Sequence, residues 1–194
     1  LVQVLEMGFI GQLSTGHVAA ITFTFPLTMV LTSIALGISI GTSSVIARSV
    51  GQQSQSPNNS DDVQRLGTHS LILVTVAMSA LALLCWLSLD PLFLALGARA
   101  DMLPLIHSYT DIYLPGSIFF TTSMILSSIM RANGNATAPG VIMTVGSLVH
   151  LLLDPILIFG WFGLPAMELS GAATAMTVTR FATFIVITAF VLKG

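Results

Sequence analysis

Two ionisable side chains interrupt an otherwise apolar stretch in the last third of the sequence. His150 and Asp154 are four residues apart, and Gly146 precedes His150 by the same spacing. Residues four apart lie on one face of a helix, so this spacing predicts a polar stripe on an apolar helix. The stripe must face protein or water rather than lipid. Ionisable groups at membrane depth are costly, and they mark a functional site by default.

Pro155 follows this carboxylate directly. Proline lacks a backbone N–H and clashes with the carbonyl four residues earlier, so we expect a helix bend at Pro155 and a free carbonyl at Leu151. Burial disfavours the charged form of a carboxylate, so Asp154 in this setting can take up a proton near neutral pH and release it when hydrated. The alternatives are that Asp154 is a polar link between helices and that His150 is a satisfied interior histidine.

Glu6 and Arg180 are two further charges at candidate membrane depth. Gln3 and Glu6 are three residues apart and share a helix face. Glu6 lies well inside the membrane if its helix begins before residue 1, and otherwise it is an interfacial residue. Arg180 lies roughly 12 residues into the last apolar segment. For it we favour a structural role, in which it neutralises a carboxylate or extends toward the membrane surface. Asp111, about two turns into its segment, is a weaker candidate because it can meet water.

Composition determines the class of protein. Hydrophobic residues make up 54% of the 194 residues, charged residues make up 7%, and the mean hydropathy is +0.93. Soluble domains carry about 25% charged residues, so this chain is predicted to be a polytopic membrane protein. It has no cluster of Lys and Arg for nucleic acid, no nucleotide-binding loop and no His/Cys/carboxylate set with metal spacing. We therefore predict no enzyme activity, no metal site and no cofactor.

Six segments are predicted to cross the membrane wholly or in part, because a span needs ~20 apolar residues. They lie at about 1–13, 18–48, 66–89, 104–130, 138–160 and 169–192. The first is short, which indicates a truncated span, and the chain begins with leucine, so we expect a fragment. The fold class predicted is an all-α six-helix membrane bundle that forms one domain over residues 1–194.

Basic residues predict the orientation of these spans. Lys and Arg concentrate on the cytosolic side of membrane proteins. The residues Arg48, Arg65, Arg131 and Lys193 fall on one side, and Arg99 falls on the other. We therefore expect the loops at 51–65 and 131–140 to be cytosolic.

Four segments, in register, resemble the multidrug and toxic compound extrusion (MATE) family. They are "EMGFIGQLSTGHVAA", "GTSSVIARSVGQ", "SSIMRANGNATAP", and the pair "LVHLLLDPILIFG" and "LSGAATAMTVTR". Their order and spacing match the family over nearly the whole chain. MATE transporters have twelve spans in two six-helix lobes, and this chain resembles the N-terminal lobe. The resemblance thus implies a missing C-terminal half.

The resemblance implies a secondary active antiporter in a bacterial inner membrane. It would export amphipathic, mostly cationic compounds in exchange for H⁺ or Na⁺, and it would use no cofactor. Glu6 and Asp154 match the ion-coupling acids of the family's first and fifth spans. The family usually has Asp and Asn where this chain has Glu6 and His150, which leaves the coupling ion open. The residues expected to line the substrate cavity are His150, Thr174, Tyr113 and Gln3.

Two other functions remain open from the sequence. A flippase for lipid-linked oligosaccharides would need a cationic cavity to hold pyrophosphate, and Arg180 is the one basic residue predicted at depth. A non-transporting membrane scaffold would not need two acids at depth, so the pair of Glu6 and Asp154 argues against it.

Overall fold

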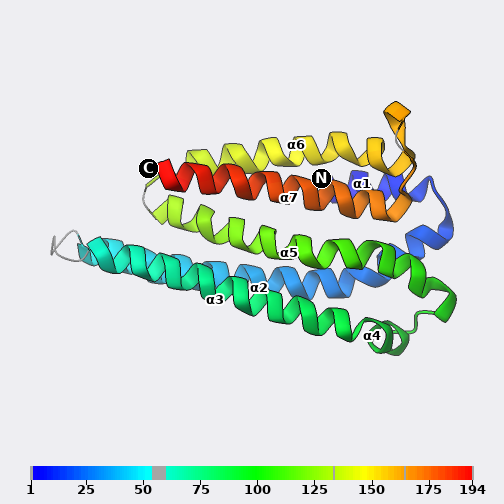
Figure 1. The fold of residues 1–194 in the computed structure, drawn as a ribbon, viewed down its shortest axis with the longest axis horizontal. Coiled ribbons are helices and arrows are strands. Elements are labelled where there is room, and N and C mark those ends of the chain that lie inside the picture. The colour runs from blue at the N-terminus through cyan, green and yellow to red at the C-terminus, as the bar shows by residue number, and fades with distance from the viewer. Residues whose placement is uncertain (1, 54–59, 133, 164, 194) are drawn as a thin grey trace.

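A computed structural model describes residues 2–53, 60–132, 134–163 and 165–193. Within these ranges it describes every side chain except those of residues 2, 3, 50–53, 60–64, 66, 67, 132, 162 and 193. The described chain is helical and holds no strand. Figure 1 shows long helices that lie side by side along one direction, as in a membrane bundle.

The elements follow one another with short connections. They are α1 (Val2–Gly11), α2 (Thr15–Gln53), α3 (Ser60–Leu87), α4 (Leu89–Ala95), η2 (Ala100–Met102), α5 (Leu103–Ala132), α6 (Thr137–Phe159), η3 (Trp161–Gly163) and α7 (Glu168–Lys193). Five helices in the described residues are long and apolar enough to cross a membrane. The predicted all-α membrane bundle is therefore confirmed. With 10 residues, α1 reaches about 15 Å, half the thickness of the hydrocarbon core.

The connection after α3 differs from the prediction. The sequence predicted a third span that continues to residue 89, followed by a loop. In the structure α3 ends at Leu87 and a separate short helix, α4, covers Leu89–Ala95. Leu89 and Phe93 of α4 are buried, so this helix packs its apolar face on the bundle. A short apolar helix of this kind adds to the apolar length of a span and is hard to separate from it by hydropathy.

Helix α5 occupies the centre of the bundle. It packs against α2, α3 and α7, while α6 packs against α7 and α1. In the apolar segment of α5, 56% of the residues are buried, compared with 17–28% in the other four long helices. The outer faces carry exposed Leu73, Leu152 and Phe190. Apolar side chains on these faces suit contact with lipid tails.

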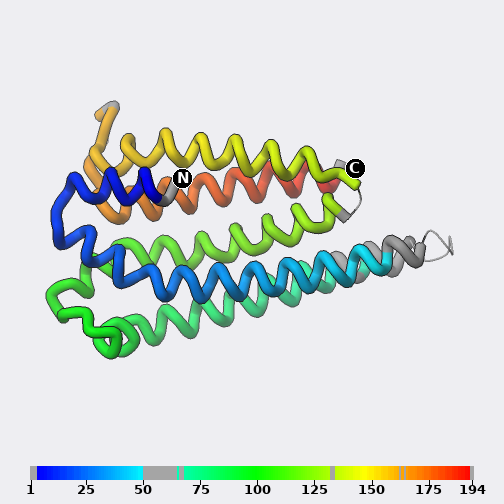
Figure 2. Tube along the Cα trace, turned by 180° about the vertical axis from the view of Figure 1, so that it is seen from behind, coloured from blue at the N-terminus to red at the C-terminus, as the bar shows by residue number. Residues whose placement is uncertain are grey.

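The two ends of the bundle differ in charge. Arg131 ends α5 at the end where the chain also terminates, and Arg99 lies at the opposite end with α4 (Figures 1 and 2). This agrees with the charge asymmetry read from the sequence, although part of the predicted cytosolic loop, 54–59, lies outside the described residues. The cytosolic location of the Arg131 end remains a prediction.

Cysteine labelling can test this orientation. Ala136 and Ala166 are both exposed, and they lie in connections at opposite ends of the bundle. In a Cys85→Ala background, we expect Ala166→Cys to react rapidly with a membrane-impermeant maleimide in intact cells. Ala136→Cys should react only after the membrane is permeabilised. The reverse pattern would show that the chain has the opposite orientation.

Candidate functional site

Three buried ionisable side chains meet between α1 and α6. Glu6 comes from α1, and His150 and Asp154 come from α6. Their exposed fractions are 4%, 8% and 0%. One ligand atom from each residue lies within 4.8 Å of the other two. We call Glu6, His150 and Asp154 the acid cluster.

Four buried polar atoms of the acid cluster have no hydrogen-bond partner among the described residues. His150 Nε2 lies 3.2 Å from Asp154 Oδ1, but the two groups are not aligned as a hydrogen bond. Both carboxylate oxygens of Asp154 and Oε1 of Glu6 also have no partner among the described residues. Buried polar atoms are nearly always hydrogen-bonded. Two carboxylates and an imidazole in this state are chemically suited to hold a proton or a small cation.

A large cavity borders the acid cluster. Its volume is about 1040 Å³, and its wall is formed by residues of α1, α2, α5, α6 and α7. Glu6 and His150 lie on the wall, whereas Asp154 is completely buried behind it. Gly146 also lies on the wall, so most of the predicted polar stripe of α6 faces the cavity.

The other predicted site residues have different positions. Tyr113 lines the cavity. Thr174 is not part of the lining, and its hydroxyl donates to the carbonyl of Ser170 at 2.6 Å in its own helix. The side chain of Gln3 lies outside the described residues. Pro155 is inside α6, about one turn before that helix ends at Phe159.

Arg180 lines the same cavity, between two aromatic rings. Its guanidinium carbon lies 4.9 Å from the ring centroid of Tyr113 and 4.7 Å from that of Phe120. No carboxylate of the described residues lies within 4.0 Å of it, so it forms no direct ion pair there. It does act electrostatically on the carboxylate of Glu6, as one of the two predicted roles requires. Arg180 is near the middle of α7, about 20 Å from its C-terminal end, which is longer than an arginine side chain.

Of the aromatic lining of α5, Tyr113 was predicted from the sequence, but Tyr109 and Phe120 were not. Tyr109, Tyr113 and Phe120 all line the cavity, and the rings of Tyr109 and Tyr113 stack with centroids 5.6 Å apart. Their spacings of four and seven residues place them on one face of a helix. That periodicity is the signal that predicts them.

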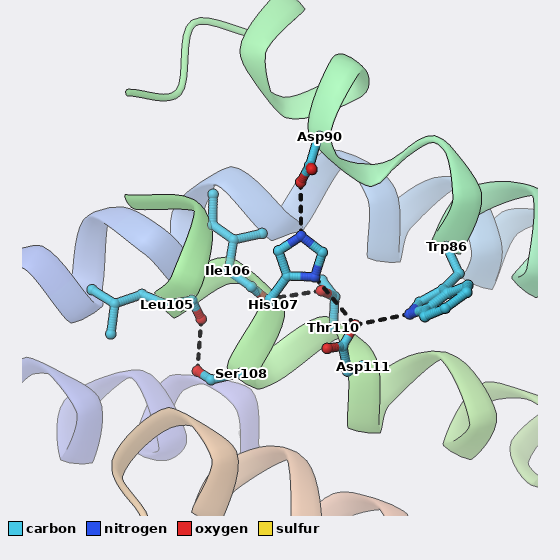
Figure 3. Close-up of polar contacts among 8 residues, drawn as sticks. All are labelled: Trp86, Asp90, Leu105, Ile106, His107, Ser108, Thr110 and Asp111. Carbon is cyan, nitrogen blue, oxygen red and sulfur yellow. Dashed lines mark hydrogen bonds and ion pairs between the residues drawn. The ribbon is translucent and has the colours of Figure 1, made fainter. Parts of the chain in front are cut away.

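Asp111 belongs to a separate polar group near α4, shown in Figure 3. His107 of α5 lies between two carboxylates: its Nε2 is 2.7 Å from Asp90 and its Nδ1 is 3.3 Å from Asp111. Trp86 of α3 donates its indole N–H to Asp111 at 3.0 Å. These side chains are partly exposed. The group therefore links α3, α4 and α5 near the surface, apart from the acid cluster.

A second histidine joins helices at the same end of the bundle. His17 of α2 lies 2.9 Å from the Glu168 carboxylate at the start of α7, and its other ring nitrogen is 2.6 Å from the Ser14 hydroxyl. Next to this contact, the Met167 N–H donates to the Leu157 carbonyl of α6 at 3.0 Å. Polar bonds thus join α2, α6 and α7 at this end.

A comparison with protein-family models identifies the family. The model described as MatE matches residues 1–156 of this chain. The chain belongs to the MatE family. The resemblance to MATE transporters in the sequence is thereby confirmed, and this is a family of transporters rather than of enzymes.

Individual MatE relatives agree with this assignment. The chain is 36% identical over 167 residues to a FAD transporter of Shewanella oneidensis, covering 86% of this chain and 36% of that protein. It is 24% identical to the probable multidrug resistance protein YoeA of Bacillus subtilis, covering 98% and 40%. The crystal structure of the Vibrio cholerae MATE transporter VcmN in the bent form superposes with a TM-score of 0.87 and 29% identity, covering 99% and 42%. The chain thus spans about two fifths of the length of these relatives.

Proposed function

We propose that this chain forms the N-terminal lobe of a secondary active antiporter. The complete transporter would export amphipathic, mostly cationic compounds across a bacterial inner membrane in exchange for H⁺ or Na⁺. Its second lobe, supplied by a C-terminal half, is the partner of this chain. The observation that carries the proposal is the acid cluster, in which Glu6 and Asp154 lie together beside a cavity of about 1040 Å³.

Charge neutralisation couples the two transport steps in this proposal. With both acids ionised, the cavity attracts a cationic, amphipathic substrate through Glu6 on its wall. When H⁺ or Na⁺ reaches the acid cluster from outside, it cancels this attraction, and the substrate leaves. Release of the ion to the cytosol restores the substrate-binding state. A ligand shifts a conformational equilibrium only by its different affinity for the two states, and the charge of the cluster supplies that difference.

Two structures of MATE transporters support alternating access by this fold. An outward-facing and an inward-facing conformation of a multidrug resistance MATE transporter both match this chain at 25% identity, with TM-scores of 0.85 and 0.86. Bent and straight conformations of a MATE protein also match. We expect Pro155, close to Asp154, to be the helix bend that responds when the acid cluster binds its ion.

Dependence on an ion gradient tests this function. We expect cells that produce the complete transporter to export ethidium faster than control cells. Efflux should stop when a protonophore collapses the proton gradient, if H⁺ is the coupling ion. If Na⁺ is the coupling ion, efflux should instead stop in sodium-free buffer. Unchanged efflux after both treatments together would refute coupled antiport.

FAD is a second candidate substrate. It is the compound named for the Shewanella relative, and it combines aromatic rings with anionic phosphates. The position of Arg180 on the cavity wall favours this candidate, because a guanidinium binds phosphate well. A lipid-linked oligosaccharide flippase is less favoured, since Arg180 is the one arginine or lysine among the cavity-lining residues that the structure describes.

A further inference from the structure

Arg180 has donor groups that the described protein does not use. Its Nη1 is buried and has no hydrogen-bond partner among the described residues. Burying a charged donor without a partner is expensive, so such a group in a native fold calls for an explanation. The guanidinium faces a cavity large enough for a small-molecule ligand. A ligand atom is therefore a candidate for the missing partner.

The two aromatic rings next to Arg180 leave it able to bind an anion. Tyr113 and Phe120 contact the guanidinium within 4.9 Å of their centroids and partly offset its charge. Contacts with ring faces do not use the N–H donors at the guanidinium edge. These donors form a planar fork that matches the oxygens of a phosphate or carboxylate.

The wall around Arg180 is suited to an aromatic ligand with a polar group. Tyr109 and Met176 supply apolar surface, and Ser123, Thr179 and Thr183 supply hydroxyl groups. The hydroxyls of Ser123 and Thr179 donate to backbone carbonyls of their own helices, so Thr183 is the one of the three with a donor for an anionic head group. The acid cluster lies on the same cavity. The cavity thus carries both acidic groups and one guanidinium, and Arg180 lies close enough to Glu6 to act on its carboxylate electrostatically.

We propose that Arg180 is an anion-binding residue of the substrate cavity, and that the transporter accepts aromatic compounds that carry a phosphate or carboxylate group. This inference rests on the proposed transport function, because it assigns a substrate class to the same cavity. The anionic group pairs with the guanidinium fork, and the aromatic part packs against the rings of α5. The cavity therefore takes compounds with a negative group as well as cationic ones.

Riboflavin and flavin mononucleotide are a matched pair of probes, because they share one ring system and differ by a phosphate. Their equilibrium binding to the purified complete transporter can be measured by flavin fluorescence, with no ion gradient present. We expect wild type to bind flavin mononucleotide about tenfold more tightly than riboflavin, which corresponds to ~1.4 kcal/mol. Arg180→Met should abolish this preference by weakening the mononucleotide alone. Arg180→Lys should retain part of it, since the charge remains without the fork.

A control variant and an independent readout separate the outcomes. Arg131→Met removes an arginine at the end of α5, outside this cavity, and should leave both affinities unchanged. Equal binding of the two flavins by wild type would overturn the proposal, whether or not the Arg180 variants fold. So would a preference that survives in Arg180→Met. Flavin binding is measured without an ion gradient, so it is independent of the efflux experiment. Equal binding of the two flavins would refute the role of Arg180 but not gradient-driven efflux. Loss of gradient dependence would refute antiport but not anion binding by Arg180.

Discussion

Asp154→Asn and Glu6→Gln each reduce gradient-driven ethidium efflux to the background of cells without the transporter; this is the largest functional effect that we expect. Each change removes a negative charge while it keeps nearly the same volume. The two carboxylates share one buried cluster with His150, so a proton or cation held there interacts with both. Removing either one leaves an incomplete site.

The double variant distinguishes one shared site from two independent ones. Residues that act as a unit show non-additive effects. Glu6→Gln combined with Asp154→Asn should therefore transport no worse than either single variant. Normal efflux by Glu6→Gln with loss in Asp154→Asn would contradict a shared site, and it would leave Asp154 with His150 as the coupling group.

Asp101→Asn is the matched control for these two acids. Asp101 is exposed at the end of the bundle that holds α4, where it pairs with Arg99 at 3.1 Å. Surface ion pairs contribute little to stability. This variant should transport at the wild-type rate, with wild type and all variants compared at equal levels in the membrane.

Gly171→Ala should have the largest effect on folding. A Cβ at this position of α7 would lie 2.6 Å from the carbonyl oxygen of Leu157 and 2.7 Å from its carbon. These are backbone atoms of α6, which cannot rotate away as a side chain does. Overpacking costs ~1–3 kcal/mol and sometimes more. We expect a lower melting temperature and a reduced yield of monodisperse protein.

Gly140→Ala is the corresponding control in α6. A Cβ there would meet nothing within 4 Å. Alanine is favoured over glycine in a helix by ~0.5–1 kcal/mol, so this variant should melt at the wild-type temperature or above it. Equal melting temperatures for Gly171→Ala and wild type would show that α6 and α7 can separate at this contact without loss of stability.

The sequence predicted the spans well because hydropathy determines them directly. The predicted segment 104–130 lies within α5, and 138–160 nearly coincides with α6. Boundaries differ where a helix continues past the hydrocarbon: the segment 18–48 became Thr15–Gln53. Polar residues beyond the apolar segment can still continue a helix. Hydropathy detects only the apolar segment, so it predicts a helix that is too short at both ends.

The site was predicted less completely. The polar spacing of α6 and the family resemblance pointed to Glu6 and Asp154, and the structure places them together. The positions of Asp154 behind the wall and of Thr174 outside the lining were not predicted. Periodicity shows which residues share a face, but not how far each helix is rotated toward its neighbours. The rings around Arg180 come from another helix, and so a single segment could not reveal them.

The histidine bonds at the α4 end have a mechanical consequence. His107 joins α5 to α4, Trp86 joins α3 to α5 through Asp111, and His17 joins α2 to α7. When helices are held together at one end of a bundle, a tilt about that end moves each residue by a distance that grows with its separation from that end. With 39 residues, α2 is about 58 Å long, so a tilt of ~5° at the braced end moves its far end by ~5 Å. A small rotation beside the cavity thus becomes a displacement of several ångströms at the opposite end of the bundle.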